Sequence, residues 1–460
     1  MSSAAPPQAP SLDTAVAVLE RHFGYSAFRA PQERVIRSVL SGRDTLGVLP
    51  TGAGKSVCFQ VPAMVLGGVT IVISPLLALM QDQVDAARRR GLPARSLNSL
   101  QTAKEQSQTR QELSEGRLRL LYVAPERHRR LLEELAEAGQ HVSLLAVDEA
   151  HCIAEWGPDF RPAYLGLGRL RSALGNPAAV ALTGSATPEV RDTIARLLRL
   201  GAHQGGRFDR HVASFDRRNL WFGVVRIKDQ RDRLRTLLEL TRDVPGAMIV
   251  YGATRNTVEA LARVLRERGK RAVAYHAGLT KERRAEVLGA FLEDRIEVVV
   301  ATCAFGMGID KPTVRLVVHW TMPPTPESYY QEAGRAGRDG NPSRCVLLYH
   351  PSDSELPRRA LDVTFPPRGL IERAGRDRAM LTTLPKNVAA SVSRLHQEIA
   401  ARTEADPWVR IARRRKAAEG RIAAVDRYAR ERRCRRAALL EYFGERSVRC
   451  SGCDVCSCRP

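Results

Sequence analysis

Short, continuous runs of apolar residues alternate with longer segments of helical period along residues 45–200. The apolar runs read TLGVL, VTIVIS, LRLLYVA, SLLAVDE and AAVALTG, and LLALMQDQVDAARRR is typical of the segments between them. A run that is apolar at every position, rather than at every second one, is typical of a strand buried on both faces of a parallel sheet. The pattern therefore predicts a doubly wound α/β domain.

The same rhythm begins again after FDRRNL, residues 215–220, with strands expected at AMIVYGA, RAVAYHAG, IEVVVATCA and VRLVVHW. It stops after CVLLYHPSD, and residues 355–433 are rich in Arg and Ala and mostly helical in pattern. We therefore expect a disordered tail at 1–14, α/β domains at 15–210 and 211–352, a helical segment at 353–419 and a cysteine-rich subdomain at 420–460.

The charge balance is strongly basic, with 72 Lys and Arg against 50 Asp and Glu and a formal net charge of +22. Such an excess favours a polyanionic partner, with nucleic acid ahead of an anionic membrane. No apolar run has the length of about 18 residues that a membrane-spanning helix needs, and MSSAAPPQAP lacks the basic start and apolar centre of a signal peptide. We expect a cytoplasmic protein with no membrane partner.

Two stretches of the first domain predict chemistry on a nucleotide. LGVLPTGAGKS, residues 46–56, passes from a strand through a Gly-rich turn into a helix. In such a turn backbone N–H groups surround phosphate oxygens, Lys55 neutralises the terminal phosphates and Ser56 binds Mg²⁺. VDEAH supplies acids after another strand, where Asp148 would hold Mg²⁺ through its water shell and Glu149 would activate the attacking water. Together they predict an ATP-hydrolysing site.

Five of the nine cysteines lie in the last 27 residues. Cys434, Cys450, Cys453 and Cys456 have the spacing C-x15-C-x2-C-x2-C, which suits a closed, tetrahedral, structural Zn²⁺ site. A redox pair is the competing interpretation of any single C-x-x-C, but three cysteines at this spacing and a fourth on a helix argue against it. Cys458 is left over.

Taken together, these motifs resemble those of superfamily 2 helicases, and specifically the RecQ family of DNA helicases, over roughly residues 15–350 and 420–457. FGYSAFRAPQ is similar to the family's adenine-reading motif, which implies stacking by Tyr25 and hydrogen bonds from Arg29 and Gln32. LPTGAGKS and VDEAH are similar to motifs I and II, and His151 joins the catalytic group. The resemblance implies that motif I binds the nucleotide through Thr51, Gly52, Ala53, Gly54, Lys55 and Ser56.

The remaining motifs follow in family order. VISPLLALMQDQV resembles motif Ia, YVAPER motif Ib, LTGSAT motif III, VYGATR motif IV, VVVATCAFGMGIDKP motif V and SYYQEAGRAGRDG motif VI. Motif VI implies that Arg335 and Arg338 reach the γ-phosphate from the second domain, so that hydrolysis tracks domain closure. Motif V adds Asp310 to the nucleotide site. The residues implied along the DNA path or in its coupling to ATP are Ser74, Pro75, Leu76, Gln83, Arg255, Thr302 and Gln331.

AEWGPDFRP, just after motif II, resembles the aromatic-rich loop of the family. Trp156 and Phe160 could stack on unpaired bases, with Arg161 beside them, and pass the signal to the acids of motif II. Buried packing is the alternative role for these aromatics. Pro158 stands where many relatives have histidine, and it would stiffen the loop.

The resemblance implies two tandem RecA-like P-loop domains with parallel sheets, followed by a mostly helical region with a zinc-binding subdomain. It implies an ATP-, Mg²⁺- and Zn²⁺-dependent monomer on the nucleoid that moves 3′ to 5′ along single-stranded DNA. Such an enzyme unwinds branched or tailed duplexes in repair or recombination, beside single-strand-binding or recombination proteins. An RNA helicase, or an ATP-gated DNA-binding or annealing protein with weak unwinding, remain the alternatives.

The C-terminal region departs from the family's longer members. We expect no winged-helix domain and no helical nucleic-acid-binding domain after the cysteines. LPKNVAASVSRLHQEIA, within 353–419, has the rhythm of a helix-turn-helix insert, and a helical scaffold with solvated arginines is the alternative.

Overall fold

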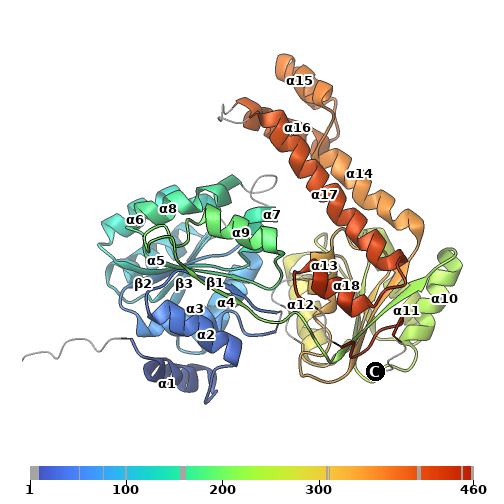
Figure 1. The fold of residues 1–460 in the computed structure, drawn as a ribbon, viewed down its shortest axis with the longest axis horizontal. Helices are drawn as coiled ribbons and strands as arrows, with labels where there is room; N and C mark the ends of the chain where they lie inside the picture. Colours follow the sequence, from blue (N-terminus) through green and yellow to red (C-terminus); the bar gives the residue numbers. More distant parts are fainter. Residues whose placement is uncertain are drawn as a thin grey trace, which may run out of the picture. The chain divides into compact units, whose positions relative to one another are not determined.

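Two compact units, Met1–Phe215 and Asp216–Pro460, make up the protein (Figure 1). The structure is a computed structural model that describes residues 10–50, 52–75, 77–98, 101–155, 162–306, 309, 311–400, 406–446 and 449–456. Each unit is built on its own parallel sheet, which confirms the predicted fold class. Among the helices in these described ranges, none is long and apolar enough to cross a membrane.

Unit 1 contains a seven-stranded sheet in the order β3-β4-β2-β5-β6-β1-β7, with every neighbouring pair parallel. The strands β1, β2 and β4 are buried at every position, as their continuous apolar sequences predict. The bounds are β1 (Thr45–Val48), β2 (Val69–Ile73), β3 (Ala94–Leu97), β4 (Leu120–Val123), β5 (Val142–Val147), β6 (Ala178–Thr183) and β7 (Asp209–Val212).

Helices cover both faces of this sheet (Figure 1). The helices α1 and α2 both contact α3, whereas α6 contacts α8 and α7 contacts α9. The bounds are α1 (Leu12–Phe23), α2 (Ala30–Leu40), α3 (Val57–Val65), α4 (Leu77–Arg89), α5 (Ala103–Ser114), α6 (His128–Glu137), α7 (His151–Glu155), α8 (Leu167–Ala173) and α9 (Pro188–Leu197), with 3₁₀ turns η1 (Pro125–Arg127) and η2 (Pro162–Gly166).

Unit 2 contains a six-stranded parallel sheet in the order β10-β11-β9-β12-β13-β8. Its strands are β8 (Leu220–Arg226), β9 (Ala247–Tyr251), β10 (Ala272–Tyr275), β11 (Val298–Ala301), β12 (Val314–His319) and β13 (Ser343–Tyr349). The helices between them are α10 (Gln230–Thr241), α11 (Arg255–Glu267), α12 (Lys281–Leu292) and α13 (Pro326–Ala333).

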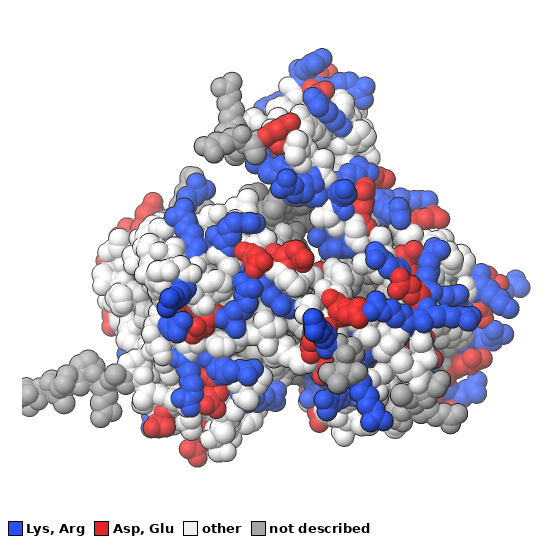
Figure 2. Space-filling view, viewed as in Figure 1, with Lys and Arg blue, Asp and Glu red and all other residues white. Residues whose placement is uncertain are grey.

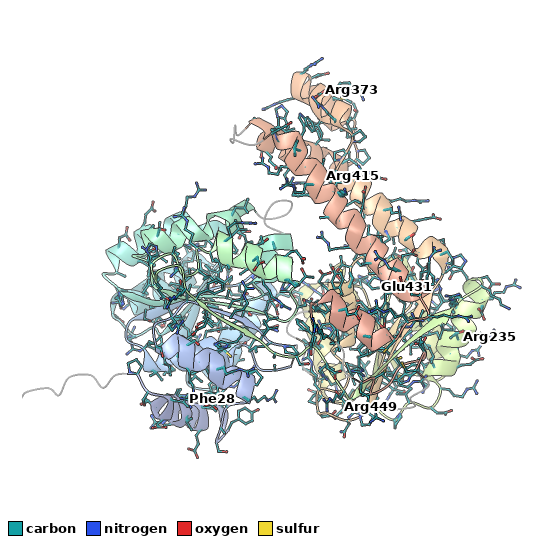
Figure 3. The ribbon with its side chains drawn as sticks, in the orientation of Figure 1. Phe28, Arg235, Arg373, Arg415, Glu431 and Arg449 are labelled. Carbon is teal, nitrogen blue, oxygen red and sulfur yellow. The ribbon has the colours of Figure 1, made fainter. Side chains whose placement is uncertain are left out.

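A helical arm follows β13 and extends away from the second sheet (Figure 1). It contains η3 (Pro351–Ser354), α14 (Glu355–Thr364), α15 (Arg368–Arg376), η4 (Arg378–Thr382), α16 (Lys386–Ala400) and the long α17 (Pro407–Arg430), and α18 (Arg435–Tyr442) comes after it. Figure 3 shows Arg373 near the tip of the arm and Glu431 at the other end of α17. LPKNVAASVSRLHQEIA contains a single helix, α16, because no Gly or Pro interrupts it after Pro385. A helix-turn-helix is therefore not contained within that stretch.

The arm and the second sheet share one hydrophobic core. Buried side chains continue from the strands through Tyr329 of α13 to Val425 and Tyr428 of α17 and Leu439 of α18. The Tyr428 hydroxyl donates to the Tyr329 hydroxyl at 3.3 Å. The C-terminal helices therefore belong to the same folding unit as the second sheet.

One buried ion pair connects the start of β1 to α8 and to neighbouring backbone. Asp44, just before β1, and Arg171 of α8 are both at most 1% exposed and lie 2.6 Å apart. The Asp44 carboxylate also accepts the N–H groups of Ala179 and Gly201, and the Arg171 guanidinium donates to backbone carbonyls, including that of Arg199 at 2.9 Å. Removing one partner leaves buried polar groups without their bonds, and this costs much more than breaking an exposed pair.

We expect Asp44→Ala to lower the free energy of unfolding by about 3 to 5 kcal/mol, because it leaves the buried Arg171 charge unpaired. Glu33→Ala, which breaks the exposed Arg37–Glu33 pair, should cost at most about 0.5 kcal/mol. Urea denaturation of both variants measures the difference. Equal losses in the two variants would contradict this assignment.

Candidate functional site

The Gly-rich turn between β1 and α3 has the backbone shape of a phosphate-binding loop. Gly52 and Gly54 have φ angles of 82° and 73°, in the left-handed region that other residues rarely adopt. A Cβ on Gly54 would lie only 2.5 Å from Nε2 of Gln32. Ser56 stands at the start of α3, where unsatisfied N–H groups favour an anion. Thr51 lies outside the described residues.

Arg29 and Gln32, at the start of α2, hold the backbone of this loop. The Arg29 guanidinium donates to the carbonyl of Gly52 at 2.7 Å, and the Gln32 amide donates to the carbonyls of Ala53 and Gly54 at 2.9 and 3.2 Å. Gln32 Oε1 accepts the Arg29 N–H at 2.9 Å. The family resemblance implied that these two side chains bond to adenine, and in this structure they bond to the backbone of the loop. Tyr25, in contrast, is 61% exposed and presents a ring that a base could stack on.

The two acids of VDEAH follow β5 directly and meet the loop. Lys55 Nζ lies 3.6 Å from Glu149 Oε1, and both side chains are less than 15% exposed. Asp148 is 3% exposed, and Glu149 has a φ angle of 46°. The parallel sheet brings the ends of β1 and β5 to the same edge, so residues far apart in the sequence form one charged cluster.

This cluster perturbs the acids in opposite directions. Burial alone would raise the pKa of Glu149. The Lys55 ammonium and His151 stabilise the ionised carboxylate more strongly and lower this pKa to about 2. Burial and the neighbouring Glu149 carboxylate raise the pKa of Asp148. Two buried carboxylates beside one ammonium leave negative charge that a divalent cation would neutralise. The donor set of Asp148 and Ser56 thus fits Mg²⁺, which prefers one or two protein oxygens and waters.

Two neighbours connect these acids to other predicted motifs. Gln83 of α4, predicted along the DNA path, donates its amide N–H to Asp148 Oδ2 at 2.7 Å. His151 Nδ1 lies 3.0 Å from the hydroxyl of Thr183, which donates to the carbonyl of Ser185. Motifs Ia and III therefore contact motif II directly.

Other residues of motif Ia are less available for contact. Ser74 is fully buried, its hydroxyl has no hydrogen-bond partner among the described residues, and Pro75 is also buried. Leu76 of motif Ia, Trp156, Phe160 and Arg161 of the aromatic-rich loop, and Asp310 of motif V lie outside the described residues.

In unit 2, motif VI lies at the end of α13. Arg335 is 7% exposed, and its Nε has no hydrogen-bond partner among the described residues. Arg338 donates to the carbonyl of Ile309 at 2.6 Å. Gln331 and Thr302 are half-buried, and Arg255 is exposed at the start of α11. No motif pointed to Arg217 and Asn219 of FDRRNL, yet both donate hydrogen bonds to the motif VI backbone. Their only signal was a polar cluster directly before a strand.

The four cysteines predicted to bind zinc converge. The sulfurs of Cys434, Cys450, Cys453 and Cys456 all lie within 4.8 Å of one another. Burial opposes ionisation of Cys453, but backbone N–H groups, first that of Cys456, lower its pKa to about 7. Burial and the adjacent sulfurs raise the pKa of Cys450 to about 11. Four thiolates this close need a cation between them, so the set fits a structural Zn²⁺. Cys458 lies outside the described residues.

The cysteine cluster is attached to the second sheet. Cys453 pairs with Phe222 of β8 in a parallel bridge, and the Val224 N–H donates to Asp454 at 3.0 Å. Asp454 also accepts from Arg435 at 3.0 Å, next to Cys434, which caps α18. The cluster thus fixes the start of α18 against the edge strand β8.

Three family models match successive parts of the chain. "DEAD/DEAH box helicase" matches residues 29–195, "Helicase conserved C-terminal domain" residues 229–340 and "RecQ zinc-binding" residues 392–457.

Curated relatives match most of the chain. It is 38% identical over 454 residues to "ATP-dependent DNA helicase RecQ" of Pasteurella multocida, covering 97% of this chain and 63% of that protein. It is 40% identical over 342 residues to "Probable ATP-dependent DNA helicase RecS" of Bacillus subtilis, covering 74% of this chain and 67% of that protein. The chain therefore spans less than two thirds of the Pasteurella protein's length.

Solved structures share the fold at low sequence identity. The helicase MrfA bound to DNA superposes with a TM-score of 0.62 at 18% identity, over 78% of this chain and 54% of that one. Saccharomyces cerevisiae Dbp5 bound to RNA and ADP BeF3 gives 0.58 at 17% identity, over 77% of this chain and 93% of that one.

We expect Cys450→Ser to lose bound zinc and to open the C-terminal module to protease, because the metal supplies folding energy to its ligands. Nucleotide binding by unit 1 should remain. Cys303→Ser, an exposed cysteine outside the cluster, should keep one zinc per chain. Metal analysis and limited proteolysis measure both effects. Full zinc content in Cys450→Ser would exclude this ligand set.

Proposed function

Because this chain belongs to the RecQ family of helicases, we propose that it is an ATP-dependent DNA helicase. We assign it movement from 3′ to 5′ along single-stranded DNA and unwinding of tailed or branched duplexes in repair or recombination. The observation that carries the proposal is the contact of Lys55 with Glu149, since it joins a phosphate-binding loop to a carboxylate placed to act on water. Polarity and pathway rest on the family alone.

The first unit would bind ATP through the 52–56 loop and α3. Mg²⁺, held by Ser56 and by Asp148 through water, would supply charge neutralisation on the phosphates. Lys55 would then move from Glu149 to the phosphates. Because Lys55 is the main influence that lowers the pKa of Glu149, its departure makes this carboxylate a better base for the attacking water. Nucleotide binding would therefore switch on the catalytic base.

The second unit would contribute Arg335 and Arg338. Both are held close to the backbone of unit 2 by burial or by a carbonyl bond, which limits the reorganisation needed when they meet the γ-phosphate charge. The aromatic-rich loop with Trp156 and Phe160 would report the presence of single-stranded DNA to the acids. Gln83, bonded to Asp148, offers a second route from the DNA path.

DNA would be bound mainly through its phosphates. The net charge of +22 supports this, and Figure 2 shows Lys and Arg side chains over both units and the arm. Binding should be salt-sensitive and weakly selective for sequence. We propose a monomer that works on the nucleoid in the cytoplasm, with single-strand-binding or recombination proteins as partners.

We expect the protein to unwind a 3′-tailed DNA duplex, but not a 5′-tailed or blunt one, and to lose this activity in Lys55→Ala. The reason is that removing the ammonium removes phosphate neutralisation in the transition state. A fluorescent strand-displacement assay with DNA and RNA oligomers measures it. Strong DNA-stimulated ATPase without unwinding would favour an annealing or binding protein, and stimulation by RNA alone would favour an RNA helicase.

A further inference from the structure

We refer to α18 together with the four clustered cysteines as the zinc module. We propose that Arg217 is a positioning residue for Arg335 and Arg338, and that Arg436 of the zinc module holds Arg217 in place. The state of the zinc module would then be transmitted to ATP hydrolysis through a chain of buried hydrogen bonds. Neither residue 217 nor residue 219 falls within the parts of the chain that the family models match. This inference rests on the proposed function, since it gives Arg335 and Arg338 a role at the γ-phosphate.

The first link of this chain joins Arg217 to the turn that carries motif VI. The Arg217 guanidinium donates to the carbonyls of Gly334, Ala336 and Gly337 at 3.3, 3.1 and 2.8 Å. The three carbonyls flank the two arginines in the sequence. Arg335 lies between Gly334 and Ala336, and Arg338 directly follows Gly337. Fixing the three peptide groups therefore fixes the directions in which both arginines leave the backbone.

Asn219 also binds this turn, and it shares the Gly337 carbonyl with Arg217. Its amide donates to the carbonyls of Gly337 and Asn341 at 2.8 and 2.9 Å. Gly337 has a φ angle of 55°, and a Cβ there would lie 2.4 Å from Nδ2 of Asn219. The turn thus approaches FDRRNL so closely that only glycine fits. Both side chains therefore contribute to holding the shape of this turn.

The second link joins FDRRNL to the zinc module. Arg436 of α18 is 2% exposed. Its guanidinium donates to the Asp216 carboxylate, to the carbonyl of Arg217 at 3.0 Å and to the carbonyl of Leu220. Arg436 comes two residues after the zinc ligand Cys434, whose sulfur accepts the N–H of Ala437 at 3.5 Å. A change at the metal would therefore move Arg436 and, with it, the backbone of Arg217.

The zinc module also supports the helix that precedes the turn. Tyr442 of α18 donates to Glu327 of α13 at 2.7 Å, and Phe443 packs on Tyr330 with ring centroids 5.0 Å apart. These contacts hold α13 in place, whereas the Arg217 guanidinium bonds to carbonyls next to both Arg335 and Arg338. A substitution of Arg217 should therefore disturb the placement of Arg335 and Arg338 without removing the contacts that hold α13.

We expect Arg217→Gln to lower the kcat of DNA-stimulated ATP hydrolysis on the order of tenfold to a hundredfold, because small misplacements of charge-neutralising groups cost this much. The affinity for ATP and the zinc content should change less than about twofold. Arg217→Lys should restore only part of kcat, since an ammonium cannot reach three carbonyls as a guanidinium does. The neighbouring Arg218→Gln is the matched control. That side chain is 86% exposed, and its 3.5 Å ion pair with Asp216 is screened by water, so its loss should leave kcat unchanged.

A double-mutant cycle tests the link to zinc. Arg436→Lys keeps the charge and should lower kcat at full zinc content, while combining it with Arg217→Gln should add less than about twofold to the loss. If the two substitutions acted independently, their fold-losses in kcat would multiply in the double variant. That result would overturn the proposed link between the zinc module and Arg217.

Normal kcat in Arg217→Gln, or a loss that only follows its zinc content or melting temperature, would overturn the positioning role. Arg335→Ala is measured in the same assay. If Arg335→Ala abolishes hydrolysis and Arg217→Gln does not affect it, this inference alone fails. If Arg335→Ala has no effect, the γ-phosphate role in the proposed function fails.

Discussion

The ion pair between Lys55 and Glu149 is the interaction on which the candidate nucleotide site of the first unit depends. It exists because β1 and β5 end at the same edge of a parallel sheet, and because Gly52 and Gly54 allow the loop to turn back over that edge. Burial keeps water from screening the pair. The same burial makes Asp148 and Glu149 costly to ionise together, so the site is arranged for an incoming cation and a polyphosphate.

The second unit also positions charged side chains through contacts between residues far apart in the sequence. Here the groups to be positioned are two arginines on a turn, and the turn is held by a short polar segment, FDRRNL, that the zinc module fixes in place. The cysteines therefore do more than close a loop at the end of the chain. Their cluster sits against β8, and its helix contacts both the motif VI helix and the segment that holds the motif VI turn.

Much of the fold and of the candidate nucleotide site could be predicted from the sequence, since both depend on local patterns. Continuous apolar runs identify buried parallel strands, and glycine spacing identifies the loop. The partners of Asp44, Gln83 and Arg217 could not be predicted, because each lies more than 60 residues away and is selected by tertiary packing. Arg29 and Gln32 show a second limit. Their motif was visible, but the backbone carbonyls that they bind were not.

In the proposed mechanism, Glu149 acts on water while Lys55 and the loop bind nucleotide. Glu149→Gln tests it most directly, because the amide keeps the shape of the side chain but cannot accept a proton. Single-turnover hydrolysis and the affinity for a fluorescent ATP analogue should be measured side by side, with DNA present. Hydrolysis should slow by more than about 100-fold while nucleotide affinity is retained. Hydrolysis at the wild-type rate would contradict the proposed role of Glu149.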